Sequence, residues 1–122
     1  MKKINPADRL DVQHYVACAL WASTDFDSGE PLDQDHTLES VAPEALDQIA
    51  SDLDDFYLLA GNLIAGLTVE QTAQDLFLTR NGHGCGFWDR GLGAVGDQLT
   101  KLAKSLGSSD PYVGDDQRVY LA

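Results

Sequence analysis

Lysine and arginine are absent between Leu10 and Thr79, a stretch of 70 residues that holds 14 aspartates and glutamates. Over the whole chain of 122 residues, 20 acidic side chains stand against 8 basic ones, and the formal net charge is −12. A field of one sign repels nucleic acid and anionic membranes and attracts basic surfaces. We therefore expect no direct binding of nucleic acid or membrane, and a basic protein as the partner.

Cysteine and long apolar runs are also scarce. Cys18 and Cys85 form no Cys-x-x-Cys motif and are too few for a disulfide framework, which fits a reducing compartment. No stretch approaches about eighteen uncharged apolar residues, and no apolar run follows the N-terminus, so neither a membrane span nor a secretory signal is predicted. The expected location is the cytoplasm.

The length and the apolar periodicity predict one mainly helical α+β domain spanning residues 1–122. Four helices are expected: from Asn5 and Pro6 to about Ala22, from Pro43 to Gly66, from Thr68 to Arg80, and from Val95 to Gly107. Residues 110–121 carry β-branched and aromatic side chains on both sides of a Gly-Asp-Asp turn signal, which predicts a C-terminal β-hairpin.

The acidic residues fall into two groups. One group lies in residues 23–38, which lack a clear apolar period and are predicted to form a long acidic loop. The other is predicted on the outer face of the second helix, opposite the apolar stripe that contains Leu46, Ile49 and Leu53. Together they are the predicted partner-binding residues: Asp25, Asp27, Glu30, Asp33, Asp35, Glu44, Asp47, Asp52, Asp54 and Asp55.

The densest run of special residues is the glycine-rich stretch from Arg80 to Gly91. Its glycines exclude a stable helix and allow close approach of neighbouring elements. Phe87 and Trp88 are expected to plug the core, and Arg80 or Arg90 to pair with Asp75, Asp89 or the acidic helices. The stretch is predicted to be a structural loop, with Arg80, Asn81, His83, Phe87, Trp88, Asp89 and Arg90 as its key side chains.

Chemical alternatives exist for the same stretch. His83 and Cys85 offer a base and a nucleophile, whereas Asn81, His83 and Asp89 suggest a hydrolytic or nuclease-like site without a defining signature. A zinc site would need His14, Cys18, His83 and Cys85, at spacings unlike those of known zinc fingers. The stretch lacks the Gly-Lys-Ser/Thr ending of a phosphate-binding loop, so the sequence does not support phosphate binding there. Neither a metal nor a cofactor is predicted.

The run from Asp75 to Gly91, which reads DLFLTRNGHGCGFWDRG, is followed by Gly96-Asp97-Gln98-Leu99 and by residues 112–116. These motifs resemble a family of small uncharacterised proteins encoded by bacteriophages and other mobile elements. The resemblance covers roughly residues 68–120 and leaves the acidic half outside. It implies a phage or mobile-element setting in a bacterial host cell, and no catalytic residue.

Two functional hypotheses follow from the sequence. In the first, the acidic half imitates nucleic-acid phosphates or masks a basic surface, and so inhibits a host nucleic-acid-binding defence protein, such as a nuclease or CRISPR-type complex. In the second, the protein is a small hydrolase or nuclease-like enzyme that uses the loop from Asn81 to Asp89. A virion component and a homodimer stay open as alternatives.

Overall fold

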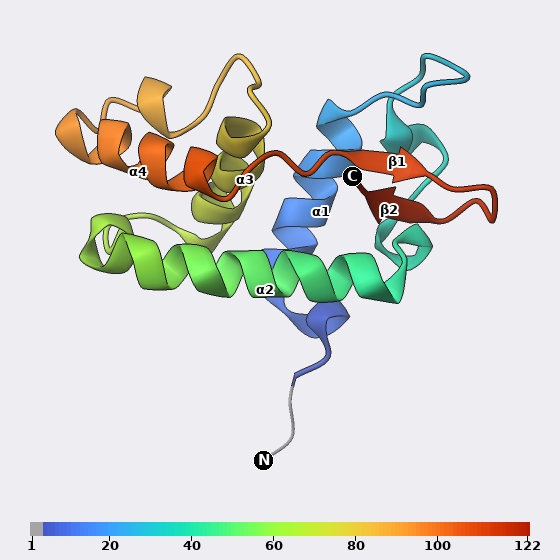
Figure 1. The fold of residues 1–122 in the computed structure, drawn as a ribbon, viewed down its shortest axis with the longest axis horizontal. Coiled ribbons are helices and arrows are strands. Elements are labelled where there is room, and N and C mark those ends of the chain that lie inside the picture. Colours follow the sequence, from blue (N-terminus) through green and yellow to red (C-terminus); the bar gives the residue numbers. More distant parts are fainter. Residues whose placement is uncertain (1–3) are drawn as a thin grey trace.

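The computed structural model describes residues 4–122, which form a mainly helical α+β fold and confirm the predicted class (Figure 1). The short initial run Met1–Lys3 lies outside the described residues. Within the described part of the chain there are four α-helices and one two-stranded antiparallel sheet. The helices are α1 (Leu10–Ala22), α2 (Pro43–Ala60), α3 (Val69–Arg80) and α4 (Ala94–Ser105), and the strands are β1 (Pro111–Val113) and β2 (Val119–Leu121).

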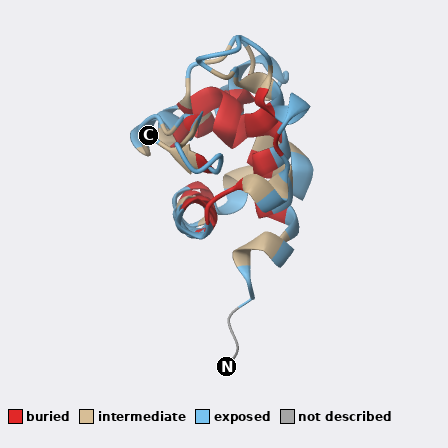
Figure 2. Ribbon diagram, turned by 90° about the vertical axis from the view of Figure 1, so that its right-hand side faces the viewer, coloured by how far each residue is buried: buried red, intermediate tan, exposed pale blue. Residues whose placement is uncertain are grey.

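The hydrophobic core lies where the helices meet. α1 packs along α3, and the Tyr15 and Phe77 rings contact edge to face at 5.5 Å. α2 crosses below them, and its Phe56 stacks on Phe87 at 5.5 Å (Figure 1). Figure 2 shows the buried residues gathered between the elements, with α2 viewed end-on and buried on one side only. The apolar stripe predicted for the second helix is therefore its core face.

The first helix begins later than predicted. Asn5 and Pro6 do start a helical turn, because Asn5 Oδ1 accepts a hydrogen bond from the Ala7 amide at 3.0 Å, but this turn is a short 3₁₀ segment, Pro6–Asp8. The backbone is extended at Arg9, with φ −77° and ψ 128°, and α1 begins only at Leu10. The long side chain of Arg9 is held by two carboxylates, which fixes this break between the turn and the helix.

The second helix ends earlier than predicted. Gly61 takes a positive φ of 51° and ends α2 at Ala60, and a 3₁₀ turn, Gly61–Ile64, follows. Gly66 was the predicted end, and it lies five residues further along the chain. Because glycine tolerates positive φ, either Gly61 or Gly66 could end the helix, and the helix ends at the first of them.

Trp88 does not plug the core. Phe87 is fully buried, whereas 49% of Trp88 is exposed. Both residues belong to a single 3₁₀ turn, Phe87–Asp89, in which successive side chains point about 120° apart. One aromatic side chain of the pair therefore points inward and its neighbour points out.

The acidic loop at residues 23–38 is more ordered than predicted. A bridge joins Thr24 to Pro31, and a 3₁₀ turn, Leu32–Gln34, buries Leu32 against the core. His36 is buried as well. Two inward side chains thus anchor a segment whose composition predicts only a loop.

The C-terminal hairpin forms as predicted and lies against the start of α2. In the antiparallel pair of β1 and β2, Pro111 lies opposite Leu121 and Val113 lies opposite Val119. Val119 also bridges to Val41, and its carbonyl accepts the Ala42 amide at 2.9 Å. The two strands are thereby tied to the helical part of the fold. Among residues 4–122, no helix has both the length and the apolar character needed to cross a membrane.

Candidate acidic docking surface

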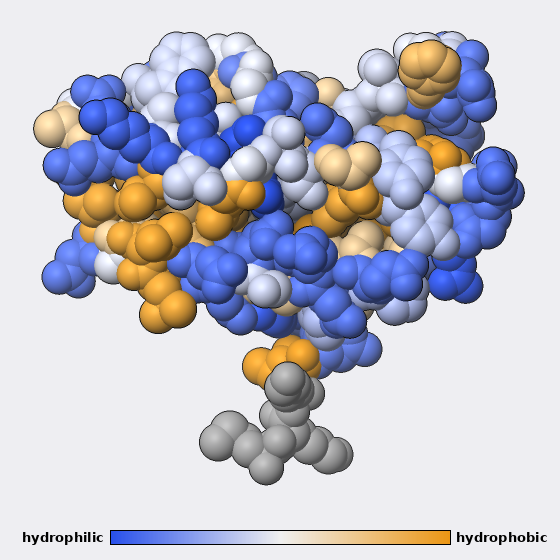
Figure 3. Space-filling view, in the orientation of Figure 1, coloured by the Kyte–Doolittle hydropathy of each residue, from blue (hydrophilic) through white to orange (hydrophobic). Residues whose placement is uncertain are grey.

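The outward side of α2 bears a row of carboxylates. Pro43 occupies the first helical position and the apolar stripe turns inward, so Glu44, Asp47 and Asp55 all point into solvent. At about 100° per residue, these three positions lie within about 80° of one another. Figure 3 shows hydrophilic side chains along most of α2. We call Glu44, Asp47 and Asp55 the carboxylate row.

Asp52 was predicted on this outer face, and that orientation is wrong. Its Oδ2 accepts a hydrogen bond from Arg80 Nη1 at 2.8 Å, and only 13% of its side chain is exposed. The Arg80 side chain is itself 4% exposed. Burial lowers the pKa of the Arg80 guanidinium, but Tyr15 and Asp52 raise it above its ordinary value overall. Asp52 therefore ties α2 to the end of α3 and is not available to a partner.

Asp54 is exposed but already paired. Arg9 Nη2 lies 2.9 Å from Asp54 Oδ1 and 2.8 Å from Asp11 Oδ2, and Tyr57 donates a 2.6 Å hydrogen bond to Asp11. Burial raises the pKa of Asp11, but the hydrogen bonds from Arg9 and Tyr57 outweigh it and lower the pKa below its usual range. This cluster joins the start of α1 to α2.

A third arginine pairs with a carboxylate in the same way. Asp75 is fully buried in α3 and accepts hydrogen bonds from Arg90 Nε and Nη2 at 2.8–3.2 Å. This confirms the predicted pairing of Arg80 and Arg90 with Asp75 or the acidic helices. In the described chain the other basic side chains are Lys101, Lys104 and Arg118, and none belongs to α2. The carboxylate row therefore has no cation on its own helix.

The loop carboxylates form a separate group. Asp27, Glu30, Asp33 and Asp35 are exposed, whereas Asp25 is half-buried and accepts the Asp27 amide at 2.9 Å. The turn at residues 25–30 lies at the upper right of the molecule in Figure 1, whereas α2 runs across its lower part. The ten predicted partner-binding carboxylates therefore do not form one continuous array.

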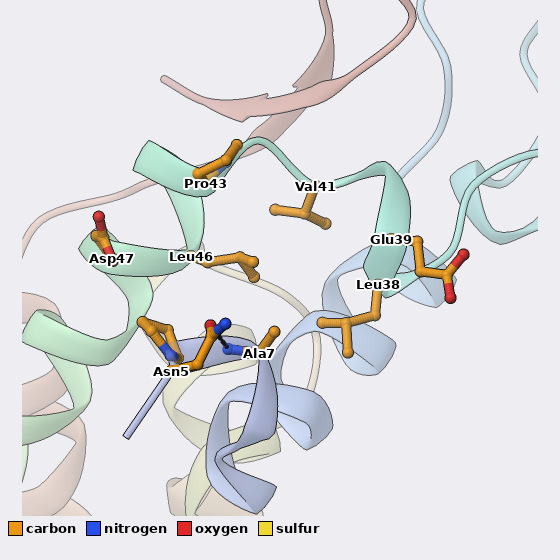
Figure 4. Close-up of a pocket in the computed structure, with 9 residues that line it drawn as sticks. Asn5, Ala7, Leu38, Glu39, Val41, Pro43, Leu46 and Asp47 are labelled. Carbon is orange, nitrogen blue, oxygen red and sulfur yellow. Dashed lines mark hydrogen bonds between the residues drawn. The ribbon is translucent and has the colours of Figure 1, made fainter. Parts of the chain in front are cut away.

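A pocket of about 380 Å³ opens at the N-terminal end of α2 (Figure 4). Its apolar lining includes Leu38, Val41 and Leu46, while Glu39 and Asp47 lie at its rim. Neither this pocket nor Glu39 was predicted from the sequence. The signal was the apolar pair Leu38 and Val41 beside the acidic loop, although only the fold brings these side chains next to α2.

The polar side chains of the glycine-rich stretch make structural contacts. Asn81 Nδ2 donates to the Phe77 carbonyl at 3.1 Å, and Asn81 Oδ1 accepts the Ser109 amide at 2.7 Å. Asp89 accepts the Gly86 amide at 3.1 Å, and the His83 ring lies 5.3 Å from that of Phe77. Asn81 and Asp89 of the hydrolase alternative thus hydrogen-bond to backbone groups, and His83 packs against a core aromatic ring.

The four residues of the zinc alternative do not make a metal site. Over residues 4–122, no group of three or more His, Cys, Asp or Glu side chains is arranged to hold a metal ion. Cys18 is buried, and this burial, with a smaller contribution from nearby Cys85, raises its pKa to about 11. Its thiol is therefore protonated at neutral pH and is a poor nucleophile.

Comparison of the chain with protein-family models, curated proteins and solved structures gave no match.

Proposed function

We propose that this protein binds a basic surface of a host nucleic-acid-binding protein through α2 and thereby blocks access of nucleic acid to that surface. One observation carries the proposal. Arg9, Arg80 and Arg90 all pair with inward or flanking carboxylates, whereas Glu44, Asp47 and Asp55 point outward with no cation on their helix. A surface of this kind attracts lysine and arginine side chains that otherwise contact phosphates.

The charge density favours masking over strict imitation of a duplex. α2 has 18 residues and so extends about 27 Å at about 1.5 Å per residue. A DNA duplex of that length presents about 16 phosphate charges, at one per about 1.7 Å. The carboxylate row supplies 3, so a partner meets a short line of charges and not a complete phosphate array. The pocket beside Asp47 adds a place for an apolar contact.

The target class rests on the resemblance to bacteriophage-encoded proteins together with this charge. A mobile element gains from inhibiting a host defence nuclease or CRISPR-type complex, and such proteins present basic surfaces to nucleic acid. The binding residues that support this function are those of the carboxylate row and the exposed loop carboxylates. Asp52 and Asp54 act instead within the fold.

The test is a competition experiment. The immobilised protein is used to recover partners from a bacterial lysate, and duplex DNA is then added to displace them. The variant Glu44→Gln/Asp47→Asn/Asp55→Asn is expected to weaken binding at least about tenfold, because it removes the three outward charges of α2. Salt is expected to weaken the wild-type complex in the same assay.

A matched variant separates a local effect from an effect of net charge. Glu70→Gln/Asp97→Asn/Asp115→Asn removes three exposed carboxylates that lie outside α2. It is expected to bind within about threefold of wild type, because distant surface charges are screened beyond about 10 Å. Equal loss in both variants, or no competition by DNA, would contradict the proposal.

A further inference from the structure

An apolar patch lies at the C-terminal end of α2. Leu58 is 84% exposed and Leu59 is 50% exposed, although Leu46, Ile49, Leu53 and Phe56 of the same helix are buried. Figure 3 shows hydrophobic side chains gathered over the left-hand end of α2 and the neighbouring α4. In a chain with a net charge of −12, an exposed apolar patch of this kind marks a surface that contacts another molecule.

The fold brings α4 to the same patch. Asp52 and Leu59 are seven residues apart and so lie on one side of α2, and Asp52 faces Arg80. Arg80 in turn binds the carbonyls of Leu106 and Gly107 at the end of α4. α2 and α4 are neighbours that run in opposite directions (Figure 1), and Leu102 and Leu106 at the C-terminal end of α4 are half-buried. We group the exposed Leu58 and Leu59 with three half-buried leucines of the neighbouring elements, Leu63, Leu102 and Leu106, and call this group the leucine patch.

The leucine patch continues the carboxylate row. At about 100° per residue, Leu58 lies within about 60° of Asp55 and about 20° of Asp47, so all three share the outward side of α2. From Glu44 to Leu58 the distance along the axis is about 21 Å, which is about four helical turns. One elongated surface thus changes from acidic to apolar along its length.

The charges on α4 leave this pattern unchanged. Lys104 is two residues from both Leu102 and Leu106, which places it about 160° away from them around the helix. Lys101 is turned about 100° or more from the same leucines. The lysines therefore lie on the flank of α4 away from the leucine patch. The cation nearest to Leu58 along α2 is Arg9, and its charge is already paired with Asp54 and Asp11.

We propose that the carboxylate row and the leucine patch together dock one helix of the partner, with basic turns over Glu44, Asp47 and Asp55 and an apolar turn over Leu58 and Leu59. This inference rests on the proposed function and specifies its partner. Charge complementarity favours a basic segment, because a second copy of this chain would bring another acidic protein of net charge −12 to the same surface.

The probes are two synthetic helical peptides of about four turns, labelled for fluorescence anisotropy. Both carry lysines at i, i+4 and i+8 on one face; one ends in a Leu-Leu turn and the other in Ser-Ser. The wild-type protein is expected to bind the Leu-ended peptide about tenfold more tightly, because the leucine turn covers Leu58 and Leu59. Leu58→Ser is expected to abolish that preference.

Phe26→Ser is the matched control. Phe26 is fully exposed and lies in the 25–30 turn, outside the leucine patch, so this variant is expected to keep the tenfold preference. Both substitutions are at exposed positions, and thermal unfolding is expected to be unchanged by either. If Leu58→Ser keeps the preference, the inference is overturned.

Two further measurements separate the possible failures. Glu44→Gln/Asp47→Asn/Asp55→Asn is expected to weaken both peptides equally. If it weakens neither, the proposed function fails; if it weakens both while Leu58→Ser has no effect, only the present inference fails. Sedimentation of the free protein is expected to show a monomer. A dimer that Leu58→Ser dissociates would mean that a second copy covers the patch, and would overturn the proposal.

Discussion

Arg80 is the most deeply buried cation of the described chain and donates hydrogen bonds to four acceptors. Its Nε donates to the Gly107 carbonyl at 2.8 Å, its Nη2 to the Leu106 carbonyl at 3.3 Å, and its Nη1 to Asp52 and the Tyr15 hydroxyl. A lysine has one nitrogen and cannot reach these partners together, so the planar guanidinium is required. Burial raises the pKa of Tyr15 to about 12, and its phenol therefore stays neutral beside the arginine.

A second residue-scale constraint lies six residues further on, at Gly86. A Cβ added there would overlap Thr79 Oγ1, a buried hydroxyl that accepts the Phe87 amide at 3.2 Å. We predict that Gly86→Ala lowers the free energy of unfolding by about 2 kcal/mol, because the threonine cannot move without losing that hydrogen bond. Urea unfolding followed by tryptophan fluorescence measures the change.

Gly84 supplies the control for this prediction. No atom lies within 4 Å of a Cβ built at Gly84, and its φ is not positive. Gly84→Ala is therefore expected to stay within about 0.5 kcal/mol of wild type. Equal effects of the two substitutions would mean that loop flexibility, and not the contact with Thr79, decides the stability of this stretch.

At the scale of elements, the cluster of Arg9, Asp11, Asp54 and Tyr57 joins α1 to α2. Tyr57 contributes a phenol whose pKa is raised, first by burial and then by its hydrogen bond to Asp11, so it remains a donor at neutral pH. Asp11 accepts from Arg9, from Tyr57 and from the Val12 amide. The carboxylate is thus stabilised in its charged form by three donors.

The pH dependence of this cluster follows from the lowered pKa of Asp11. Its ordinary value is 3.8, and the folded value lies below that. The stabilisation is therefore complete well above pH 3.8 and is lost as the pH falls through and below that value. We predict that Asp11→Asn costs about 2 kcal/mol at pH 7, and that the difference from wild type shrinks as the pH is lowered from 5 toward 2. Urea unfolding across this range measures it, and a constant difference would contradict the assignment.

Helices and helix ends that depend on local interactions could be predicted from the sequence, whereas those that depend on tertiary packing could not. α3 and α4 follow from local periodicity, and the Thr68 cap of α3 is present as expected, with its hydroxyl accepting the Gln71 amide at 3.0 Å. The true end of α2 was missed because Gly61 and Gly66 have the same local propensity. Which glycine ends the helix depends on how the following residues pack.

The same distinction applies to the candidate site. The outward direction of Glu44, Asp47 and Asp55 follows from the apolar period of the helix alone. Asp52 lies at the edge of that face, and its partner is Arg80, 28 residues away, so its inward orientation depends on the tertiary structure. The leucine patch was missed, although the same period places Leu58 and Leu59 outside the apolar stripe of α2, and the structure leaves both exposed.

At the scale of the whole molecule, charge works against the compact fold. The chain has a net charge of −12, and the carboxylate row places like charges within a few helical turns of one another. Such self-repulsion destabilises a folded protein and is weakened by salt. Among the ion pairs that oppose this repulsion, that of Arg80 with Asp52 is buried and is screened much less.

We therefore predict that salt stabilises this protein. Raising sodium chloride from about 0.02 to about 0.5 M is expected to increase the free energy of unfolding by roughly 1 kcal/mol and the melting temperature by about 4 °C. Calorimetry in sodium chloride and in choline chloride measures the effect, and equal rises in the two salts indicate screening and not binding of sodium. Glu44→Gln/Asp47→Asn/Asp55→Asn is expected to show a smaller rise, since it has fewer repulsions to screen. A melting temperature that falls with salt in the wild-type protein would mean that exposed ion pairs, such as that of Arg9 with Asp54, outweigh the repulsion along α2.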